Sequence, residues 1–485
     1  MKKVNVMVIT LAVFLTTFMT AIEGTIVSTA MPTIVSSLNG LKIMNWVVAI
    51  FVFMTTVSTP IFGKLADSVG RKPIFLFGIT LFIVGSALCG LAHNMVQLIL
   101  FRVIQGLGSG AVQPVAMTIL ADMYEPERRA KMLGLNSGFW LVASIIAPLL
   151  GGFVIQKLSW HWVFYINVPI GLLALILVII FMNESRAKTK VKLDLKGTFW
   201  LMILLLSLMF LLQQLGTLKP VYLLVLFTVV LVCAILFYRE EKRAEDPIMP
   251  ITMLKKRQFL AMNMTTLLIG GVVAGFEFYL PTWMQGVKGV SATVAGFAVT
   301  PCSLLWVVGS FMVGRLLKRW GVRKTFYGVL TIILIVDCVL LALPITTPVW
   351  TYYVIAGING VAFGVVIPAS QVQAQVLVEP SNVGVATSFN TLMRFLGQTM
   401  MMSIFGITFN TVVAKQLAKH PQLNQAMMNK IVSSAKAKEL AANLVPQLRQ
   451  VLFSALKGVF VASLVAIVLA LLFNSIYQSK NKQQA

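Results

Sequence analysis

Long apolar segments alternate with short charged segments along the whole chain. A helix needs about 20 mainly apolar residues to cross a bilayer. Fourteen segments meet this requirement, at 6–30, 45–65, 73–92, 96–121, 131–156, 161–182, 195–215, 220–238, 258–284, 293–317, 324–344, 349–375, 384–410 and 453–476. The pattern therefore predicts an all-α integral membrane protein with fourteen spans and both termini on one side.

The spacing of the spans predicts three parts. Residues 1–185 hold a six-helix bundle, residues 186–257 form a charged linker with two additional spans, and residues 258–485 hold a second six-helix bundle. The second bundle contains a long loop, 411–452, rich in Lys, Gln and Ala. This loop either forms one or two amphipathic helices outside the bundle or is a solvated linker.

The charges of the chain fit a membrane protein better than a nucleic-acid-binding protein. Hydrophobic residues make up 58% of the chain and charged residues 11%, too few charges to cover a soluble protein of this size. The net charge of +24 comes from short basic clusters between apolar segments, which the positive-inside rule explains. We therefore expect no nucleic-acid partner, and cytoplasmic loops and termini where the basic residues concentrate.

Other chemistry is sparse. The four cysteines lie singly in apolar segments and the three histidines are scattered, so we expect neither a disulfide framework nor a metal site, and no cofactor. The first apolar segment contains Glu23 and extends to Pro32, which indicates a retained span rather than a signal peptide. No cluster of nucleophile, acid and histidine predicts an enzyme.

A short basic loop occurs twice. The sequence from Gly63 to Lys72 returns in altered form from Gly314 to Lys324, 251 residues later. This repeat indicates a duplicated membrane protein. Two homologous bundles that rock around a midplane site are the usual design of a transporter.

The first copy of the loop has the residues of a conformational latch. Gly63 and Gly70 permit a tight turn, and Asp67 can bind a helix amino terminus or an arginine of a neighbouring helix, with Arg71 beside it. In the second copy Lys318 takes the place of Asp67, so the latch is asymmetric. The alternative is plain topogenic charge, which explains the basic residues but not Asp67 or the glycines.

Two acids within predicted spans are candidates for proton and substrate coupling. Glu23 shares a helix face with Thr16 and Thr20, and Glu277 follows it by 254 residues, close to the spacing of the repeated loop. Acids within spans are costly and usually functional. Since a proton and a cation compete for one desolvated carboxylate, such an acid can exchange one for the other. The alternative for each acid is a structural hydrogen bond or ion pair between helices.

The remaining charges within spans receive different predictions. Arg102 needs a partner in the low dielectric and is expected to hold a carboxylate deprotonated, while the glycines that follow it favour close helix packing. Asp337 lies in an unrelieved apolar stretch, which favours a structural or peripheral role. Arg394 either lines a cavity or pairs with an acid.

An adaptable apolar cavity is a further prediction. Large and polar side chains of the second half are candidates for its wall: Phe276, Trp283, Met284, Asn390 and Met393. Aromatic and methionine side chains suit lipophilic cations. The alternative is ordinary packing or contact with lipid.

At this point the motifs resemble those of a known family. The chain resembles the fourteen-span drug:proton antiporters of the major facilitator superfamily over essentially its full length. Five regions carry the resemblance: the helix 1 motif Ala21–Pro32, the loop Gly63–Lys72, the helix 4 motif Leu98–Gly110, the helix 5 antiporter motif with Gly134, Pro148, Gly151 and Gly152, and the helix 6 motif Trp160–Gly171. Two features depart from the family: Glu23 stands where Asp is usual, and Ala143 and Ala147 replace glycines.

The resemblance implies a function and a location. It implies efflux of drugs or other lipophilic, cationic compounds by drug:proton antiport with alternating access, in a bacterial cell membrane. Separately, we expect the protein to act as a monomer. The helix 4 motif, with Arg102, is linked in the family to proton transfer, and the helix 5 motif separates exporters from importers. Two alternatives stay open: export of a specific neutral or anionic metabolite or antibiotic, and proton-coupled uptake by a symporter.

Overall fold

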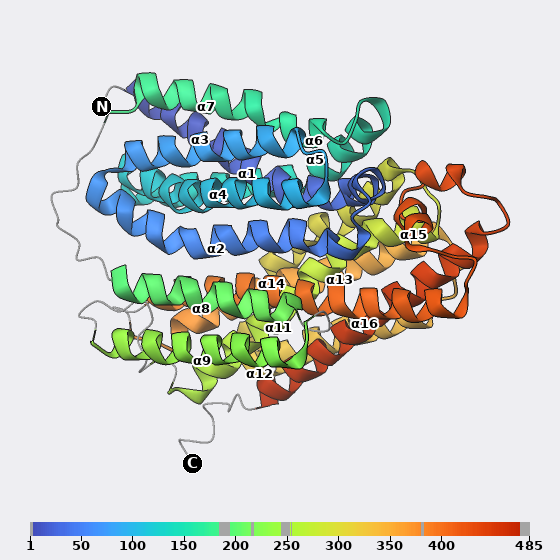
Figure 1. Ribbon diagram of the computed structural model, residues 1–485. Helices are drawn as coiled ribbons and strands as arrows, with labels where there is room; N and C mark the ends of the chain where they lie inside the picture. Colours follow the sequence, from blue (N-terminus) through green and yellow to red (C-terminus); the bar gives the residue numbers. More distant parts are fainter. Residues whose placement is uncertain are drawn as a thin grey trace, which may run out of the picture. The chain divides into compact units, whose positions relative to one another are not determined.

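The computed structural model describes residues 3–183, 195–214, 218–243, 253, 255–379 and 383–475. Every regular element in these ranges is helical (Figure 1). The helices group into two compact units. Unit 1 is Met1–Leu193 with the later segments Gly289–Phe297 and Ala426–Leu440, and unit 2 is Asp194–Lys288, Ala298–Gln425 and Ala441–Ala485.

Unit 1 contains most of the helices of the first half of the chain, and α1, α2, α3, α4, α5 and α7 run lengthwise beside one another (Figure 1). Their bounds are α1 Lys3–Leu38, η1 Leu41–Ile43, α2 Met44–Val69, α3 Arg71–Gly90, α4 Met95–Met123, α5 Pro126–Lys157, α6 Trp162–Tyr165 and α7 Asn167–Phe181. Two short elements come from the later segments, α15 Gln425–Ile431 and η4 Lys436–Glu439.

Unit 2 contains the helices of the linker and of the second half. Their bounds are α8 Leu195–Gln214, α9 Pro220–Arg243, α11 Arg257–Thr282, the π-helical turn η2 Trp283–Val287, α12 Ala292–Ala342, α13 Val349–Val376, α14 Val383–Lys419 and α16 Val445–Ser475. The first turns of α12, residues 292–297, belong to unit 1. The helix α12 turns at Gly321, whose φ of 70° breaks the helical backbone, so α12 has two legs. The pair α8 and α9 lies side by side (Figure 1).

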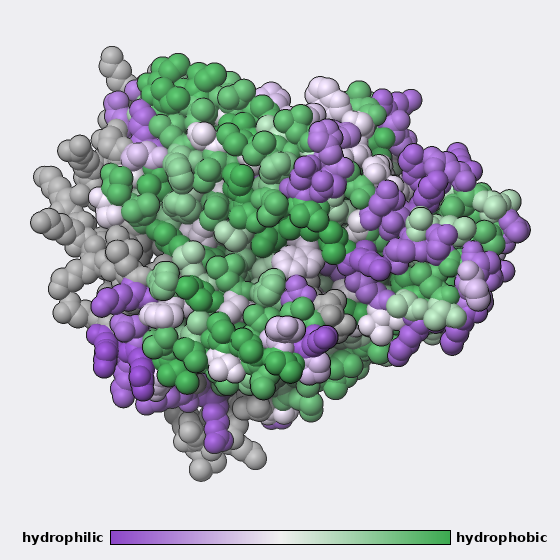
Figure 2. Space-filling model, in the orientation of Figure 1, coloured by the Kyte–Doolittle hydropathy of each residue, from purple (hydrophilic) through white to green (hydrophobic). Residues whose placement is uncertain are grey.

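Twelve helices of the described chain are long and apolar enough to cross a membrane. This set counts the two legs of α12 as one helix, and α8 has only a shorter apolar stretch, Phe199–Leu211, in the described residues. The prediction of an all-α membrane fold is confirmed, whereas the number fourteen stays a prediction. Figure 2 shows the matching surface, with broad hydrophobic areas over the sides of the helices and hydrophilic residues concentrated at helix ends.

Glycines on α3 and α4 determine how closely these two helices pack. A Cβ on Gly85 would lie 2.5 Å from the backbone nitrogen of Gln105, and one on Gly108 would lie 2.4 Å from that of Phe82. Only a residue without a side chain fits at such positions, as is typical of helix contacts in membranes. The predicted packing role of the glycines after Arg102 is confirmed.

The predicted loop 411–452 is shorter than expected and folded. The helix α14 continues to Lys419 and α16 begins at Val445, with α15 and η4 between them. In this segment Glu439 accepts a hydrogen bond of 2.8 Å from Lys436 and lies 3.0 Å from the Nζ of Lys430, and these contacts hold its pKa below the usual value. The side chain of Asn429 accepts a hydrogen bond of 3.3 Å from the backbone N–H of Leu41. The structure therefore favours short helices over a solvated linker.

Candidate transport site

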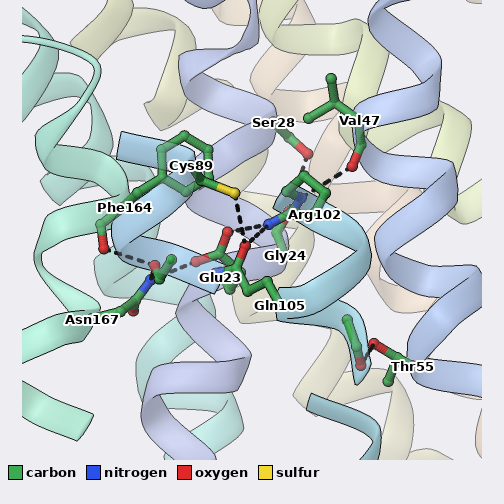
Figure 3. Close-up of polar contacts among 12 residues, drawn as sticks. Glu23, Gly24, Ser28, Val47, Thr55, Cys89, Arg102, Gln105, Phe164 and Asn167 are labelled. Atoms are coloured by element: carbon green, nitrogen blue, oxygen red, sulfur yellow. Dashed lines mark hydrogen bonds and ion pairs between the residues drawn. The ribbon is translucent and has the colours of Figure 1, made fainter. Parts of the chain in front are cut away.

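A buried ion pair in unit 1 joins two of the predicted residues. The guanidinium of Arg102, on α4, donates through Nη1 to the Oε1 atom of Glu23, on α1 (Figure 3). The exposed fraction is 0% for Glu23 and 1% for Arg102. The prediction that Glu23 faces inward is confirmed, and so is the prediction that Arg102 needs a partner.

Three further contacts hold the guanidinium of Arg102. Its Nη1 also donates to Oε1 of Gln105 at 2.8 Å, and its Nε donates to the carbonyl of Val47 at 3.1 Å. The Cζ atom lies 4.0 Å from the ring centroid of Phe51, a cation–π contact. The positive charge is therefore fixed by α2 and α4 as well as by the acid on α1.

Asn167 holds the second oxygen of Glu23. Its Nδ2 donates to Oε2 of Glu23 at 2.6 Å and to Oγ of Ser86 at 3.0 Å, while Ser86 donates to the carbonyl of Phe164 at 2.8 Å (Figure 3). Asn167 is the first residue of α7 and Ser86 is on α3. The carboxylate is therefore held from two sides by elements far apart in the sequence.

Two amide atoms beside the ion pair remain available. Within the described chain, Nε2 of Gln105 and Oδ1 of Asn167 are buried without a hydrogen-bond partner. Next to Glu23, Gly24 is exposed, and a Cβ placed on it would meet no heavy atom within 4 Å. Within the described chain, a donor and an acceptor without partners thus lie on the two residues that contact the ion pair, Gln105 and Asn167, and this arrangement suits binding of a proton, a water molecule or a polar group.

Gln105, Asn167 and Ser86 were missed as site residues by the sequence analysis. Gln105 lies three residues after Arg102, on the same helix face, and this spacing was an available signal. Asn167 lies 144 residues after Glu23, and Ser86 is in an apolar stretch. Asn167 belongs to the helix 6 motif Trp160–Gly171, which was an available signal for the residue but not for its partner, and no local pattern indicates Ser86.

The second predicted acid, Glu277 of unit 2, has a different environment. It is half-buried on α11, and the charge of Arg394, on α14, acts on it. Among the described residues, neither side chain has a direct ion pair or hydrogen bond to the other. Arg394 lies with its Cζ 4.8 Å from the ring centroid of Phe395. The two predicted residues are brought near each other but are not joined.

Close packing of α11 on α14 surrounds this second site. A Cβ on Gly270 would lie 2.7 Å from the carbonyl oxygen of Arg394, and one on Gly397 would lie 1.8 Å from that of Leu267. Asn390 donates to Oδ1 of Asn263 at 3.0 Å and to Oγ1 of Thr266 at 2.9 Å. The predicted cavity residue Asn390 is therefore part of a polar contact between the two helices.

The aromatic residues predicted to line a cavity are packed in this conformation. Phe276 is buried, with its ring centroid 6.1 Å from that of Phe363. Trp283 is buried in the π-helical turn, with centroids 5.3 Å from Phe453 and 5.9 Å from Tyr352. A role in binding a substrate stays a prediction for these residues.

Asp337 is buried within unit 2. Its Oδ2 accepts a hydrogen bond of 2.8 Å from Ser463, on α16. This contact joins α12 to α16, in agreement with the structural role expected from the sequence.

The predicted latch loop turns at Gly70, and its Arg71 has an additional partner, Asp122. Gly70 has a φ of 123°, and Gly321, the equivalent residue of the second copy, has a φ of 70°. Arg71 forms an ion pair with Asp122 of α4 and donates to the carbonyl of Thr118 at 3.1 Å. The prediction that Gly63 contributes to the turn is wrong, because Gly63 lies within α2 and only Gly70 of the two has a positive φ. Asp67 lies on the same helix, but its side chain is outside the described part of the structure.

The antiporter motif on α5 contacts the first turn of α12. A Cβ on Gly152 would lie 2.5 Å from Cα of Thr293, and one on Gly296 would lie 2.6 Å from the carbonyl oxygen of Pro148. A Cβ on Gly151 would lie 3.0 Å from the side chain of Ile26, on α1. These small residues permit close backbone approach. The remaining motif residue, Gly134, lies in α5, and its surroundings are outside the described part.

An all-helical membrane protein with a buried ion pair and acids within its spans has the features of a multi-pass transporter. The sequence profile of the Major Facilitator Superfamily matches residues 13–402, and the chain belongs to this family of transporters. It is therefore a membrane transporter rather than an enzyme.

Curated relatives agree with this assignment. The chain is 37% identical over 423 residues to multidrug resistance protein 3 of Bacillus subtilis (strain 168), covering 86% of this chain and 82% of the relative. It is 31% identical over 403 residues to the multidrug efflux pump SdrM of Staphylococcus aureus (strain N315), covering 82% and 89%.

Solved structures share the fold. A bacterial homologue of the human lysosomal transporter Spinster, in an inward-facing and occupied conformation, has a TM-score of 0.69 at 17% identity and covers 97% of this chain and 98% of its own. The nucleoside transporter NupG has a TM-score of 0.66 at 11% identity, with 97% and 100% covered.

Proposed function

We propose that the chain exports drugs or other lipophilic, cationic compounds in exchange for protons. The observation that carries this proposal is the buried Glu23, which is joined to Arg102 and Asn167 in a transporter. The names of its relatives, multidrug resistance protein and multidrug efflux pump, support export of drugs.

The site suggests how exchange proceeds. A proton on Glu23 cancels its charge and weakens its hold on Arg102, and a cationic compound near the carboxylate favours loss of that proton. Each ligand therefore stabilises a different charge state of the site. If the two states prefer different conformations, binding shifts the equilibrium between inward-open and outward-open forms.

The other predicted residues complete the proposal. Glu277, near Arg394, is a second proton or cation site, with Phe276, Trp283 and Asn390 toward a substrate cavity. Gly63, Asp67, Gly70 and Arg71 form the conformational latch, and Gly134, Pro148, Gly151 and Gly152 form the antiporter motif that makes the protein an exporter. The protein acts as a monomer in a bacterial cell membrane, with both termini in the cytoplasm, as the clustering of basic residues supports.

The test is dye transport by everted membrane vesicles with an imposed proton gradient, acidic inside. Export corresponds here to uptake of a lipophilic cationic dye, followed by its fluorescence. We expect uptake by the parent and its loss in Glu23→Gln, because the amide cannot exchange a proton. Glu277→Gln reports on the second acid in the same assay.

Glu439→Gln is the matched control, since the side chain of this acid is exposed and lies outside the spans. It is expected to transport like the parent. If Glu23→Gln and Glu277→Gln also transport like the parent, the exchange mechanism is wrong. If the parent moves no cation, the substrate is neutral or anionic, or the protein is an uptake system.

A further inference from the structure

The turn of α12 carries a dense group of exposed cations, which we call the α12 corner: Arg315, Lys318, Arg319, Arg323 and Lys324. All five lie within ten residues around Gly321. Thr325 fixes the turn by donating to the carbonyls of Gly321 at 2.7 Å and Leu316 at 3.2 Å. Among the described residues, none of the five cations has a carboxylate partner. In the part of the chain that the structure describes, no carboxylate therefore neutralises this group of neighbouring cations.

In the first copy of the loop, by contrast, protein groups bind the corresponding cations. There Arg71 pairs with Asp122, and Lys72 donates to the carbonyls of Ile179 at 2.9 Å and Met182 at 2.5 Å. Arg323 stands at the position equivalent to Lys72, and its guanidinium lies 5.7 Å from the ring centroid of Tyr327. Protein groups thus bind Arg71 and Lys72 of the first copy, whereas no described acid or carbonyl binds the cationic side chains of the second copy.

The surface next to the α12 corner is apolar. Val308, Phe311 and Met312 are exposed on the first leg of α12, and Phe311 is 85% exposed. Helical spacing continues this exposed stripe to Arg315 and Arg319. Trp320, 49% exposed, lies within the corner, and tryptophan is typical of the membrane interface. The apolar stripe suits contact with a lipid acyl chain, and the cations and tryptophan at its end suit contact with the headgroup of the same lipid.

We propose that the α12 corner binds anionic phospholipids, whose headgroup phosphate takes the place that Asp122 and the helix carbonyls have in the first copy. Arginine and lysine bind phosphate through charge-assisted hydrogen bonds, and cations beside a membrane attract anionic lipids. The exposed Val308, Phe311 and Met312 contact the acyl chains. This inference concerns the lipid partner and does not depend on which compound is transported.

Trp320 provides a probe at the site. The full chain is reconstituted in phosphatidylcholine vesicles that contain a small, fixed fraction of either brominated phosphatidylglycerol or brominated phosphatidylcholine. Bromine on the acyl chains quenches nearby tryptophan. The contribution of Trp320 is the difference between the parent and Trp320→Phe. We expect several-fold stronger quenching of this contribution by the anionic lipid, and a decrease of the preference as salt is added.

A fourfold variant, Lys318→Gln, Arg319→Gln, Arg323→Gln and Lys324→Gln, is expected to abolish the preference. The matched control neutralises three exposed cations near the end of α9, Arg239, Lys242 and Arg243, which have Glu240 and Glu241 among them. This control variant should keep the preference for the anionic lipid. Gel filtration checks that each variant is folded. Equal quenching by both lipids, a preference that survives in the fourfold variant, or its removal by inorganic phosphate in the buffer would each overturn the proposal.

Discussion

The two duplicated acids, Glu23 and Glu277, lie in contrasting environments. Glu23 is fully buried, and both of its oxygens have protein partners, Arg102 and Asn167. Glu277 is half-buried, and its nearby cation, Arg394, attracts it without direct contact. The two acids predicted to be equivalent therefore differ in how fully protein groups neutralise their charges.

This difference suggests a division of labour between the units. A carboxylate held by an arginine and an amide is preorganised, and releasing it requires a competing ligand. A carboxylate near a cation, but not joined to it, can accept a proton or a cationic compound with less rearrangement. Under the proposed function, we expect Glu23 to act as the switch and Glu277 to have the more adaptable binding role.

The largest expected effect comes from removing the cation of each pair. Arg102→Gln leaves Glu23 buried without its counter-charge, which costs about 3–5 kcal/mol of stability when one partner of a buried pair is lost. Arg394→Gln should cost clearly less, because Glu277 has no ion pair to lose. Thermal unfolding of the purified protein in detergent, followed by gel filtration, measures both.

The double variant Glu23→Gln with Arg102→Gln is the control for this comparison. It removes both charges, so it should recover part of the stability lost in Arg102→Gln. Equal losses for Arg102→Gln and Arg394→Gln would show that the two acids are neutralised alike, against the contrast drawn here.

A smaller effect is expected from adding a methyl group between the helices that support each site. Gly397→Ala would place a Cβ 1.8 Å from the carbonyl oxygen of Leu267, forcing α11 and α14 apart near Glu277 and Arg394. Gly85→Ala would place one 2.5 Å from the backbone of Gln105, beside the first site. Overpacking of this kind costs about 1–3 kcal/mol. We expect the larger loss of stability and transport for Gly397→Ala.

Two other glycines are matched controls for this pair. A Cβ on Gly24 or on Gly328 would meet no heavy atom within 4 Å, so alanine at either position should be tolerated. Loss of stability in these controls equal to that in Gly397→Ala would mean that backbone flexibility, rather than helix spacing, explains the effect.

Much of the fold, but only part of the first site, could be predicted from the sequence. The apolar segments predicted the helices, because each span must satisfy its own backbone hydrogen bonds. The repeat predicted equivalent turns, and Gly70 and Gly321 both have positive φ. Glu23 and Arg102 were identifiable because charges within spans are rare.

The contacts that the sequence did not predict depend on how neighbouring helices are rotated about their axes. Asn167 and Ser86 reach the site only because α7 and α3 turn those faces toward α1. Likewise, Arg71 binds Asp122 of α4, a residue that lies 51 positions further along the chain. A sequence pattern gives the periodicity of one helix and does not give the rotation of its neighbour.

The smallest expected effect compares two asparagines, Asn167 in the first unit and Asn390 in the second. Asn390→Ala removes hydrogen bonds to Asn263 and Thr266, and such bonds between membrane helices are worth about 0.6 kcal/mol on average. Asn167→Ala removes a similar bond but also leaves Oε2 of Glu23 without its donor, which costs about 1 kcal/mol or somewhat more. Stability should therefore separate the two variants only slightly.

Transport should separate them clearly. Asn167 fixes the carboxylate that is proposed to exchange protons, so dye uptake per folded molecule should decrease in Asn167→Ala and stay near the parent level in Asn390→Ala. Everted vesicles with equal amounts of folded protein provide the measurement. The opposite ranking would place the exchange site in the second unit, because then the bonds around Asn390, rather than the donor to Glu23, would control transport.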